Sequence, residues 1–191
     1  ARPDPDTHFV NAIDTTRKTV QKLKQQGINH IIVLSHLGLD QDQELAASVD
    51  GISLIVGGHS HTLQGSMSNI GLSDIPYAET INSTPILHAG KYAETLGLAQ
   101  INFDSNGKVT ELIGNNYFML DDNIQVSTKD GQPADSAIAA DLIEQLFTHP
   151  SIKGAQHDDA IHQVIHSQYR PSLDALENQI LAHIPRNFVH T

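Results

Sequence analysis

The sequence predicts an α/β fold in which parallel strands come first, an antiparallel hairpin follows, and a helical appendage ends the chain. Two short runs rich in Val, Ile and Leu each follow a segment with helical periodicity, which is the rhythm of βα units. The turn sequence at residues 104–107, Asp-Ser-Asn-Gly, then separates two strand-like runs and is a strong hairpin signal. Helical patterns fill most of the sequence after residue 135.

The first helix is predicted over about residues 7–26, because apolar side chains recur there at steps of three and four. Gly27 can close it as a C-terminal cap. Residues 30–35 follow as a short, β-branched apolar run. We expect this run to form a strand of a parallel sheet that is covered on both faces.

A second helix and strand repeat this order. Asp40 and Asp42 offer N-terminal caps to a short helix that ends near residue 49. Residues 52–56 are again short and apolar, as in a buried strand. Residues 63–83 are rich in Gly, Ser and Asn and predict a long loop, which is either functional or a tolerated surface insertion.

The last part of the chain changes in style. Residues 84–87 predict a further short strand before the hairpin. We place a boundary near residue 123, so that residues 1–123 form one domain and residues 124–191 a mainly helical linker or the start of a following domain. The helical patterns of the second part cover three segments, residues 136–147, 158–169 and 171–183.

Composition excludes several classes of function. The 191 residues carry a formal charge of -11 without a stripe of Lys or Arg, so binding to nucleic-acid phosphates is not expected. The absence of Cys excludes disulfides, thiolate zinc sites and cysteine nucleophiles. No apolar run approaches the ~20 residues of a membrane-spanning helix. The sequence begins at Ala1 without Met, and we expect an upstream piece to have been removed or omitted.

Histidine is unusually frequent, with 12 residues against 11 Lys plus Arg, and it is the commonest metal ligand. His36 comes directly after the first predicted parallel strand, and His59 and His61 come directly after the second. Parallel strands joined by a right-handed crossover end at the same edge of a sheet, where ligands of α/β folds bind. Neighbouring strands lie only about 4.8 Å apart, so the three imidazoles can converge on zinc or a similar cation.

Each of these histidines alone is most simply an ordinary loop residue, but their motifs favour the metal interpretation. The motifs are Ser-His-Leu-Gly at residues 35–38 and Ile-Val-Gly-Gly-His-Ser-His-Thr at residues 55–62. Together with residues 84–92 and the hairpin, they resemble the later metal motifs of bacterial 5'-nucleotidases and related UDP-sugar hydrolases, within the calcineurin-like metallophosphoesterases. The resemblance covers roughly residues 7–120.

This resemblance implies the second half of a four-layer α/β/β/α metallophosphoesterase domain, with the C-terminal helices as an appendage. It also implies two divalent ions (Zn, Mn or Co) that activate a water to attack phosphorus. In the family pattern, His36 and His59 share one ion and His61 serves the other. The implied substrate is a nucleotide or a similar phosphate ester, and the implied location is periplasmic or extracellular.

The other family ligands are an Asp-x-His, a bridging Asp and the Asn of a Gly-Asn-His-Asp/Glu motif. Asp6 and His8 have the letters of the first motif, but no strand precedes them, so we interpret them as coincidence. Residues 114–116, Gly-Asn-Asn, lack the His of the last motif and are expected to continue the hairpin. We therefore expect the N-terminal half of the domain to be missing, at most one ion to bind weakly, and this chain alone to be inactive.

Two other functions stay open. A thiosulfate-pathway hydrolase of the same superfamily uses similar His motifs, on sulfur rather than phosphorus. A non-catalytic module could instead bind one metal through the three histidines or pair with another chain.

Other candidate residues have simpler explanations. His162 and His166 are spaced like the zinc ligands of metalloproteases, but Gln163 replaces the general-base Glu, so a solvated helix face is predicted. His88, after a strand, is predicted to be packed or to support a ligand from behind. The pairs at residues 121–122 and 158–159, all Asp, predict solvated turns or helix starts.

Overall fold

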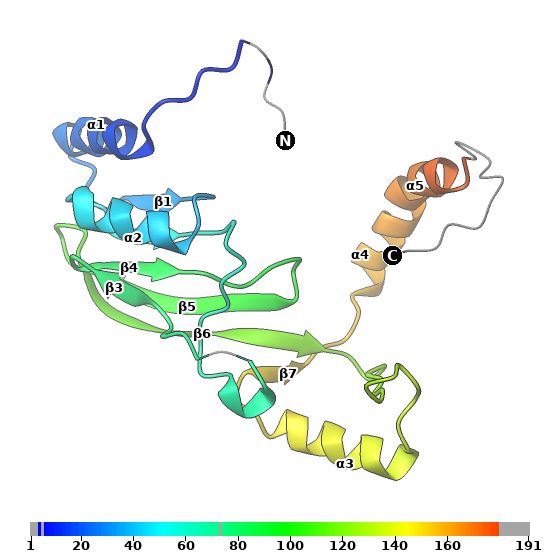
Figure 1. Cartoon of the computed structure of the whole chain (residues 1–191). Coiled ribbons are helices and arrows are strands. Elements are labelled where there is room, and N and C mark those ends of the chain that lie inside the picture. The colour runs from blue at the N-terminus through cyan, green and yellow to red at the C-terminus, as the bar shows by residue number, and fades with distance from the viewer. Residues whose placement is uncertain (1–3, 5, 73, 180–191) are drawn as a thin grey trace. The chain divides into compact units, whose positions relative to one another are not determined.

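The computed structural model describes residues 4, 6–72 and 74–179 (Figure 1). The chain forms two compact units, residues 1–154 and residues 155–191. The first unit contains two β-sheets and helices, which confirms the predicted α/β class. The domain boundary near residue 123 stays a prediction.

The first sheet has the strand order β1-β2-β4-β3. Strands β1 (Ile32–Leu34), β2 (Leu54–Val56) and β4 (Thr84–Leu87) are parallel neighbours, and all three were predicted. Strand β3 (Glu79–Ile81) adds an antiparallel edge. It lies in the segment predicted as a loop, because Glu-Thr-Ile is not an apolar run like those of β1 and β2. A short 3-10 helix, η1 (Ser68–Ile70), precedes it.

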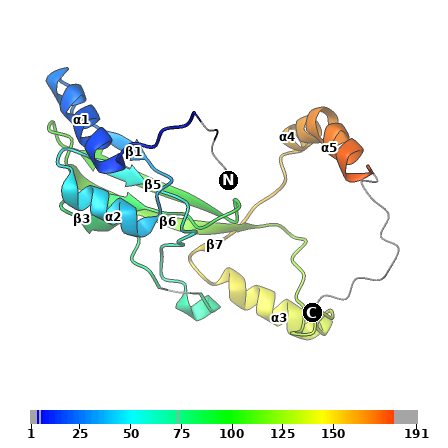
Figure 2. The ribbon, with the colours of Figure 1, turned by 45° about the horizontal axis from the view of Figure 1, so that its top comes forward.

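Helices α1 (Ala12–Gln25) and α2 (Leu39–Ser48) lie on one side of this sheet, and the hairpin lies on the other (Figures 1 and 2). The predicted start of α1 near residue 7 is wrong, because the Asn11 side chain accepts a hydrogen bond from the backbone of Asp14 and fixes the helix start there.

The predicted capping of α2 by Asp40 or Asp42 is also wrong. Gly38 holds the cap position and makes no side-chain cap hydrogen bond. Asp42 is instead fully buried, with 0% of its surface exposed.

The hydrophobic core lies between the two helices and the parallel sheet. Ile55 of β2 is fully buried and lies opposite Val33 on one side and Ile86 on the other. Side chains alternate along a strand, so Ile32 and Leu34 point to the face away from the helices. They are 52% and 82% exposed, and the prediction that this strand is covered on both faces is therefore wrong.

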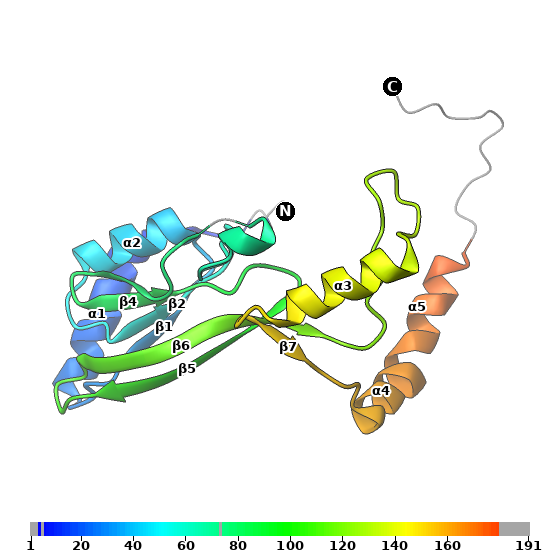
Figure 3. The same cartoon turned by 90° about the horizontal axis from the view of Figure 1, so that it is seen from below.

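The second sheet is built on the predicted hairpin of β5 (Thr95–Phe103) and β6 (Val109–Leu120), shown from below in Figure 3. Strand β6 runs through Gly114, Asn115 and Asn116, which confirms that these residues continue the hairpin. A third strand, β7 (Ile152–Gly154), was not predicted and pairs with β6 in parallel. The first unit also contains α3 (Ser136–Phe147), capped by Asp135 as expected of an Asp before a helix.

The second unit is helical over most of its described residues. It contains α4 (Asp159–Val164), the π-helical turn η2 (Ile165–Tyr169) and α5 (Arg170–Glu177). Asp158 caps α4, as predicted for a helix start. The predicted continuation of the last helix beyond residue 179 lies outside the described residues.

Candidate metal centre

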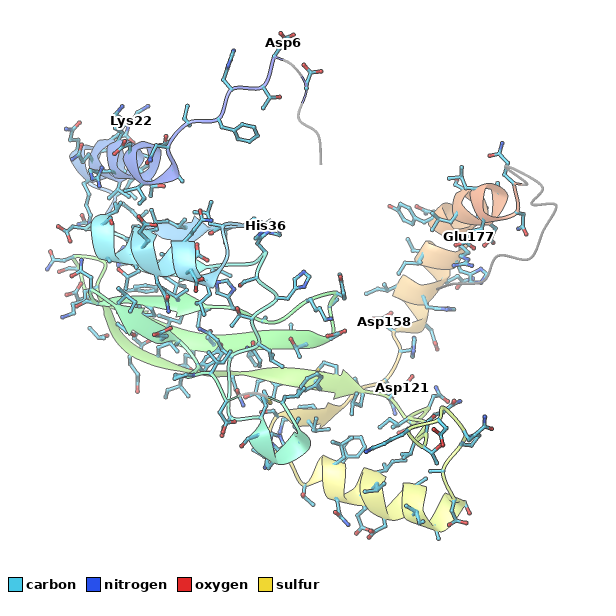
Figure 4. All side chains as sticks on the ribbon, viewed as in Figure 1. Asp6, Lys22, His36, Asp121, Asp158 and Glu177 are labelled. Carbon is cyan, nitrogen blue, oxygen red and sulfur yellow. The ribbon has the colours of Figure 1, made fainter. Side chains whose placement is uncertain are left out.

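The parallel strands bring the histidine loops to one edge of the sheet. Leu34 lies opposite Val56 in the last paired position of β1 and β2, and Ser35 donates a backbone hydrogen bond of 2.9 Å to Val56. His36 and His59 therefore leave the sheet from adjacent strand ends. Figure 4 shows the His36 side chain at this edge.

The imidazole rings of His36 and His59 meet edge to face, with centroids 5.2 Å apart and planes at 72°. An imidazole nitrogen lies about 2 Å from a bound zinc ion, so two rings on one tetrahedral ion have centroids roughly 5–6 Å apart. The observed separation therefore fits two ligands of the same cation. Both side chains are exposed, so an ion and a substrate can reach them.

His61 has a different ring partner. Its imidazole lies 5.3 Å from the ring of Tyr92, at 60°. Within the described residues, no group of three or more His, Asp or Glu side chains is arranged to hold a metal ion. The structure thus brings His36 and His59 together, and the assignment of His36, His59 and His61 as metal ligands stays a prediction.

The backbone of this loop is strained. His59 and His61 both have left-handed conformations, with φ of 75° and 56°. Residues other than Gly adopt this region at a cost of about 1–2 kcal/mol, and such strain clusters at functional sites. The Ser60 hydroxyl between them accepts a hydrogen bond of 3.1 Å from Leu39 and contacts the Thr62 hydroxyl at 2.8 Å. These contacts hold the strained loop against the start of α2.

Gly57 and Gly58 contribute space rather than a left-handed turn, because neither has a positive φ. A Cβ atom on Gly58 would lie 3.1 Å from Nδ1 of His36. A Cβ on Gly57 would overlap the side chains of Asp42 and His88. These glycines therefore permit a close approach of backbone to side chains.

The remaining candidates belong to the other compact unit or are structural. His88 is 2% exposed and packed, as predicted. His162 and His166 are exposed on the second unit, with ring centroids 5.7 Å apart. Asp121 accepts a hydrogen bond from the backbone of Asn123, as expected of a turn. Over the part of the chain that the structure describes, no helix has the length and apolar character needed to cross a membrane.

Several known proteins similar to this chain are nucleotidases. The Treponema pallidum protein named "Probable 5'-nucleotidase" is 30% identical over 190 residues, which cover 94% of this chain and 32% of that protein. The solved NAD nucleotidase of Haemophilus influenzae is 26% identical with a TM-score of 0.78, over 94% of this chain and 37% of that one. A 5'-nucleotidase precursor of Thermus thermophilus is 26% identical with a TM-score of 0.61, over 95% and 31%.

The chain thus spans about a third of the length of these relatives. No protein-family model matches the sequence.

Proposed function

The chain belongs to the 5'-nucleotidase/UDP-sugar hydrolase family of calcineurin-like metallophosphoesterases. On this premise we propose that it supplies the second half of a dinuclear-metal phosphohydrolase site that acts on nucleotides or similar phosphate esters. The observation that carries the proposal is the meeting of His36 and His59, which are far apart in sequence, at a separation that suits one shared ion.

Each histidine has a defined task in this proposal. His36 and His59 bind one cation through their ring nitrogens, and His61 binds a neighbouring cation. A pair of divalent ions in such a site activates a water for attack on phosphorus and neutralises the developing phosphoryl charge. Imidazole nitrogens suit zinc and similar divalent ions, in keeping with this donor set. The left-handed backbone at His59 and His61 keeps the two side chains on one tight loop.

The other ligands are proposed to come from the N-terminal half of such a domain. At β1, the sheet face opposite the helices carries exposed apolar side chains, which supports this proposal. Leu34 of β1 is 82% exposed and Leu98 of β5 is 63% exposed. Strand β1 is also an edge strand, and an exposed apolar edge strand invites pairing. The missing half would cover this face while it brings its carboxylate and amide ligands to His36 and His59.

The proposed substrate class follows the names of the relatives, which are 5'-nucleotidases and an NAD nucleotidase. The net charge of -11 disfavours capture of a polyanion by the protein surface, so the phosphate of a small substrate must be met locally by cations. A periplasmic or extracellular location is part of the same proposal and rests on the family resemblance.

Reconstitution tests the proposal. The purified chain is assayed with manganese, zinc or cobalt against AMP and an aryl phosphate, alone and mixed with the upstream polypeptide. We expect turnover only in the mixture, because a catalytic zinc ion usually has three protein ligands and the chain offers two to one ion and one to the other. His61→Ala should abolish the reconstituted turnover. Substantial turnover by the lone chain would contradict the proposal, and one bound ion without any turnover in the mixture would favour a non-catalytic module.

A further inference from the structure

A buried pair of polar side chains lies directly behind the candidate metal centre. Asp42 of α2 and His88 after β4 are 0% and 2% exposed, and Nε2 of His88 lies 2.9 Å from Oδ2 of Asp42. They are far apart in sequence, so the fold itself brings them together. Neither residue has a part in the function proposed above.

The pair is tied to the turn that carries His36. The Ser35 hydroxyl donates a short hydrogen bond to the other carboxylate oxygen of Asp42. The same hydroxyl accepts a hydrogen bond of 3.1 Å from the backbone of Leu37. Asp42 therefore fixes the residues on both sides of His36.

The pair is also tied to the loop that carries His59. Gly57, two residues before His59, lies so close to the pair that a Cβ atom there would overlap Oδ2 of Asp42 and Nε2 of His88. Its backbone N–H donates to Leu87 at 2.9 Å, next to His88. The pair thus sets the position of the chain from which His59 emerges.

Further buried polar groups hold His88 in place. Its backbone N–H donates to the side chain of Gln64 at 2.9 Å, and its carbonyl accepts from the side chain of Asn116 at 2.8 Å. The Asn116 amide also donates to the Gln64 carbonyl at 2.8 Å. Gln64 and Asn116 are 0% and 1% exposed. Among the described residues, no buried side-chain nitrogen or oxygen lacks a partner, and a fully satisfied buried network is rigid.

Stability alone does not account for such a pair. Well-packed apolar side chains of similar volume often stabilise a fold as much as a buried polar or charged pair does. What the pair adds here is a common anchor for two loops that must present their rings at one spacing. Partners behind metal-binding histidines have this effect, and their loss typically weakens metal binding about 10–100-fold.

We propose that Asp42 and His88 are positioning residues that hold the His36 and His59 loops in register, so that the two imidazoles meet before any ion arrives. The metal-binding part of this inference rests on the function proposed above. The positioning part concerns the metal-free chain and stands on its own geometry.

Four variants of the 191-residue chain test the inference. Asp42→Ala and His88→Ala each break the pair. His88→Gln keeps a side-chain N–H that can donate to Asp42. His149→Ala is the matched control, because His149 is also buried (6% exposed) and is hydrogen-bonded at 2.7 Å to Asn69, which lies outside the histidine loops.

The first readout is metal-free: the nuclear Overhauser contact between the rings of His36 and His59. We expect this contact in the wild type, in His88→Gln and in His149→Ala, and its loss in Asp42→Ala and His88→Ala. The second readout is a zinc titration followed at the resonances of these two imidazoles. The same two variants should weaken zinc binding about 10–100-fold. His149→Ala should lower the thermal midpoint while zinc affinity stays within about twofold, since it leaves every group near the ion in place.

Two outcomes would overturn the inference. One is a folded His88→Ala chain with the wild-type ring contact. The other is an equal loss of ring contact in His149→Ala, which would make the effect one of general stability. If the wild-type chain shows the ring contact and loses it in His88→Ala, but no zinc binds at His36, the positioning inference holds and the proposed metal function fails.

Discussion

The ring of His61 packs against the ring of Tyr92 with centroids 5.3 Å apart, and both residues have left-handed backbones, with φ of 56° and 53°. His59 and Ala93 are in the same region, with φ of 75° and 58°. Two facing loops at one sheet edge therefore both contain residues that Gly would replace with less strain. The chain thus has His61 at this position although its backbone conformation there is strained.

Substitution of His61 by Gly and by Ala measures this strain. Removing the imidazole in both variants leaves the backbone as the main difference between them. His61→Gly should be more stable than His61→Ala by about 0.5–1 kcal/mol, because Gly relieves the left-handed penalty and this gain exceeds its entropic cost in the unfolded chain. Urea unfolding of both variants gives the difference.

His36 provides the control, because its φ is not positive. There, Gly should be less stable than Ala by about 0.5–1 kcal/mol. The same sign of the difference at both positions would show that the backbone at His61 is not strained.

The close approach at Gly57 gives a second prediction. In Gly57→Ala the new methyl group overlaps Asp42 and His88, and overpacking of this kind costs about 1–3 kcal/mol. Gly154→Ala is the matched control, since its Cβ would meet only Phe147 at 3.9 Å, an ordinary contact. In urea unfolding, the free energy of unfolding should decrease markedly for Gly57→Ala and change by no more than about 0.5 kcal/mol for Gly154→Ala. Equal stability of the two variants would mean that the backbone at Gly57 has room to move.

The hairpin turn gives a prediction on pH. The backbone N–H groups of Lys108 and Asn106 both donate to Oδ1 of Asp104 at 2.9 Å and lower the pKa of this carboxyl below its ordinary value of 3.8. A carboxyl with a lowered pKa in the folded state stabilises the fold above its unfolded pKa, and this contribution is lost as pH falls through the folded pKa. As the pH falls below about 4, the free energy of unfolding should therefore decrease more steeply for the wild type than for Asp104→Asn. The Asn side chain keeps the acceptor oxygen and does not titrate. Urea unfolding at pH 5, 4 and 3 measures this difference. An equal change of the free energy of unfolding with pH in the two proteins would reject this account of the turn.

The sequence predicts the central strands and the hairpin because their signals are local. Val and Ile runs bounded by Gly, and the Asp-Ser-Asn-Gly turn, need no tertiary partner to be recognised. Strands β3 (Glu-Thr-Ile) and β7 (Ile-Lys-Gly) were missed because neither is an apolar run, and only pairing with β4 and β6 makes them strands.

The meeting of His36 and His59 followed from topology, since parallel strands joined by a crossover end at one edge. The environment of Asp42 could not be predicted in the same way. Its position near a helix start suggested a cap, whereas its partners Ser35 and His88 come from two other segments and are found only in the folded chain. The exposure of Leu34 could not be predicted either, because an apolar strand has the same sequence whether or not a second layer covers it.

Metal binding gives a fourth prediction. His59→Ala removes a proposed ligand of the ion shared with His36, and the loss of a ligand should cost at least the ~10–100-fold that a supporting residue costs. His162→Ala is the control, because His162 is equally exposed and lies in the other compact unit. Cobalt affinity at His36, followed by its ring resonances in the reconstituted protein, should weaken only in His59→Ala. Equal affinity in the two variants would remove His59 from the ligand set.

The exposed face of β1 gives the last prediction, which concerns the missing half of the domain. Leu34 is 82% exposed in this chain, so Leu34→Ser should change the stability of the lone chain by less than about 0.5 kcal/mol. Ile86→Ser, at a position with 0% exposure on the same sheet, should cost several-fold more, about 3 kcal/mol or above.

Leu34→Ser should have a larger effect once the upstream polypeptide covers this face. Full burial of a Leu side chain contributes about 1.5–3 kcal/mol, so Leu34→Ser should weaken association of the two polypeptides roughly 10–100-fold in a calorimetric titration. Leu176→Ser, which removes an apolar side chain that is 66% exposed in the other compact unit, is the control for a general effect of lost surface hydrophobicity. Unchanged association in Leu34→Ser would show that the N-terminal half does not dock on this face. Exposure of Leu34 would then not support a dinuclear site completed by that half.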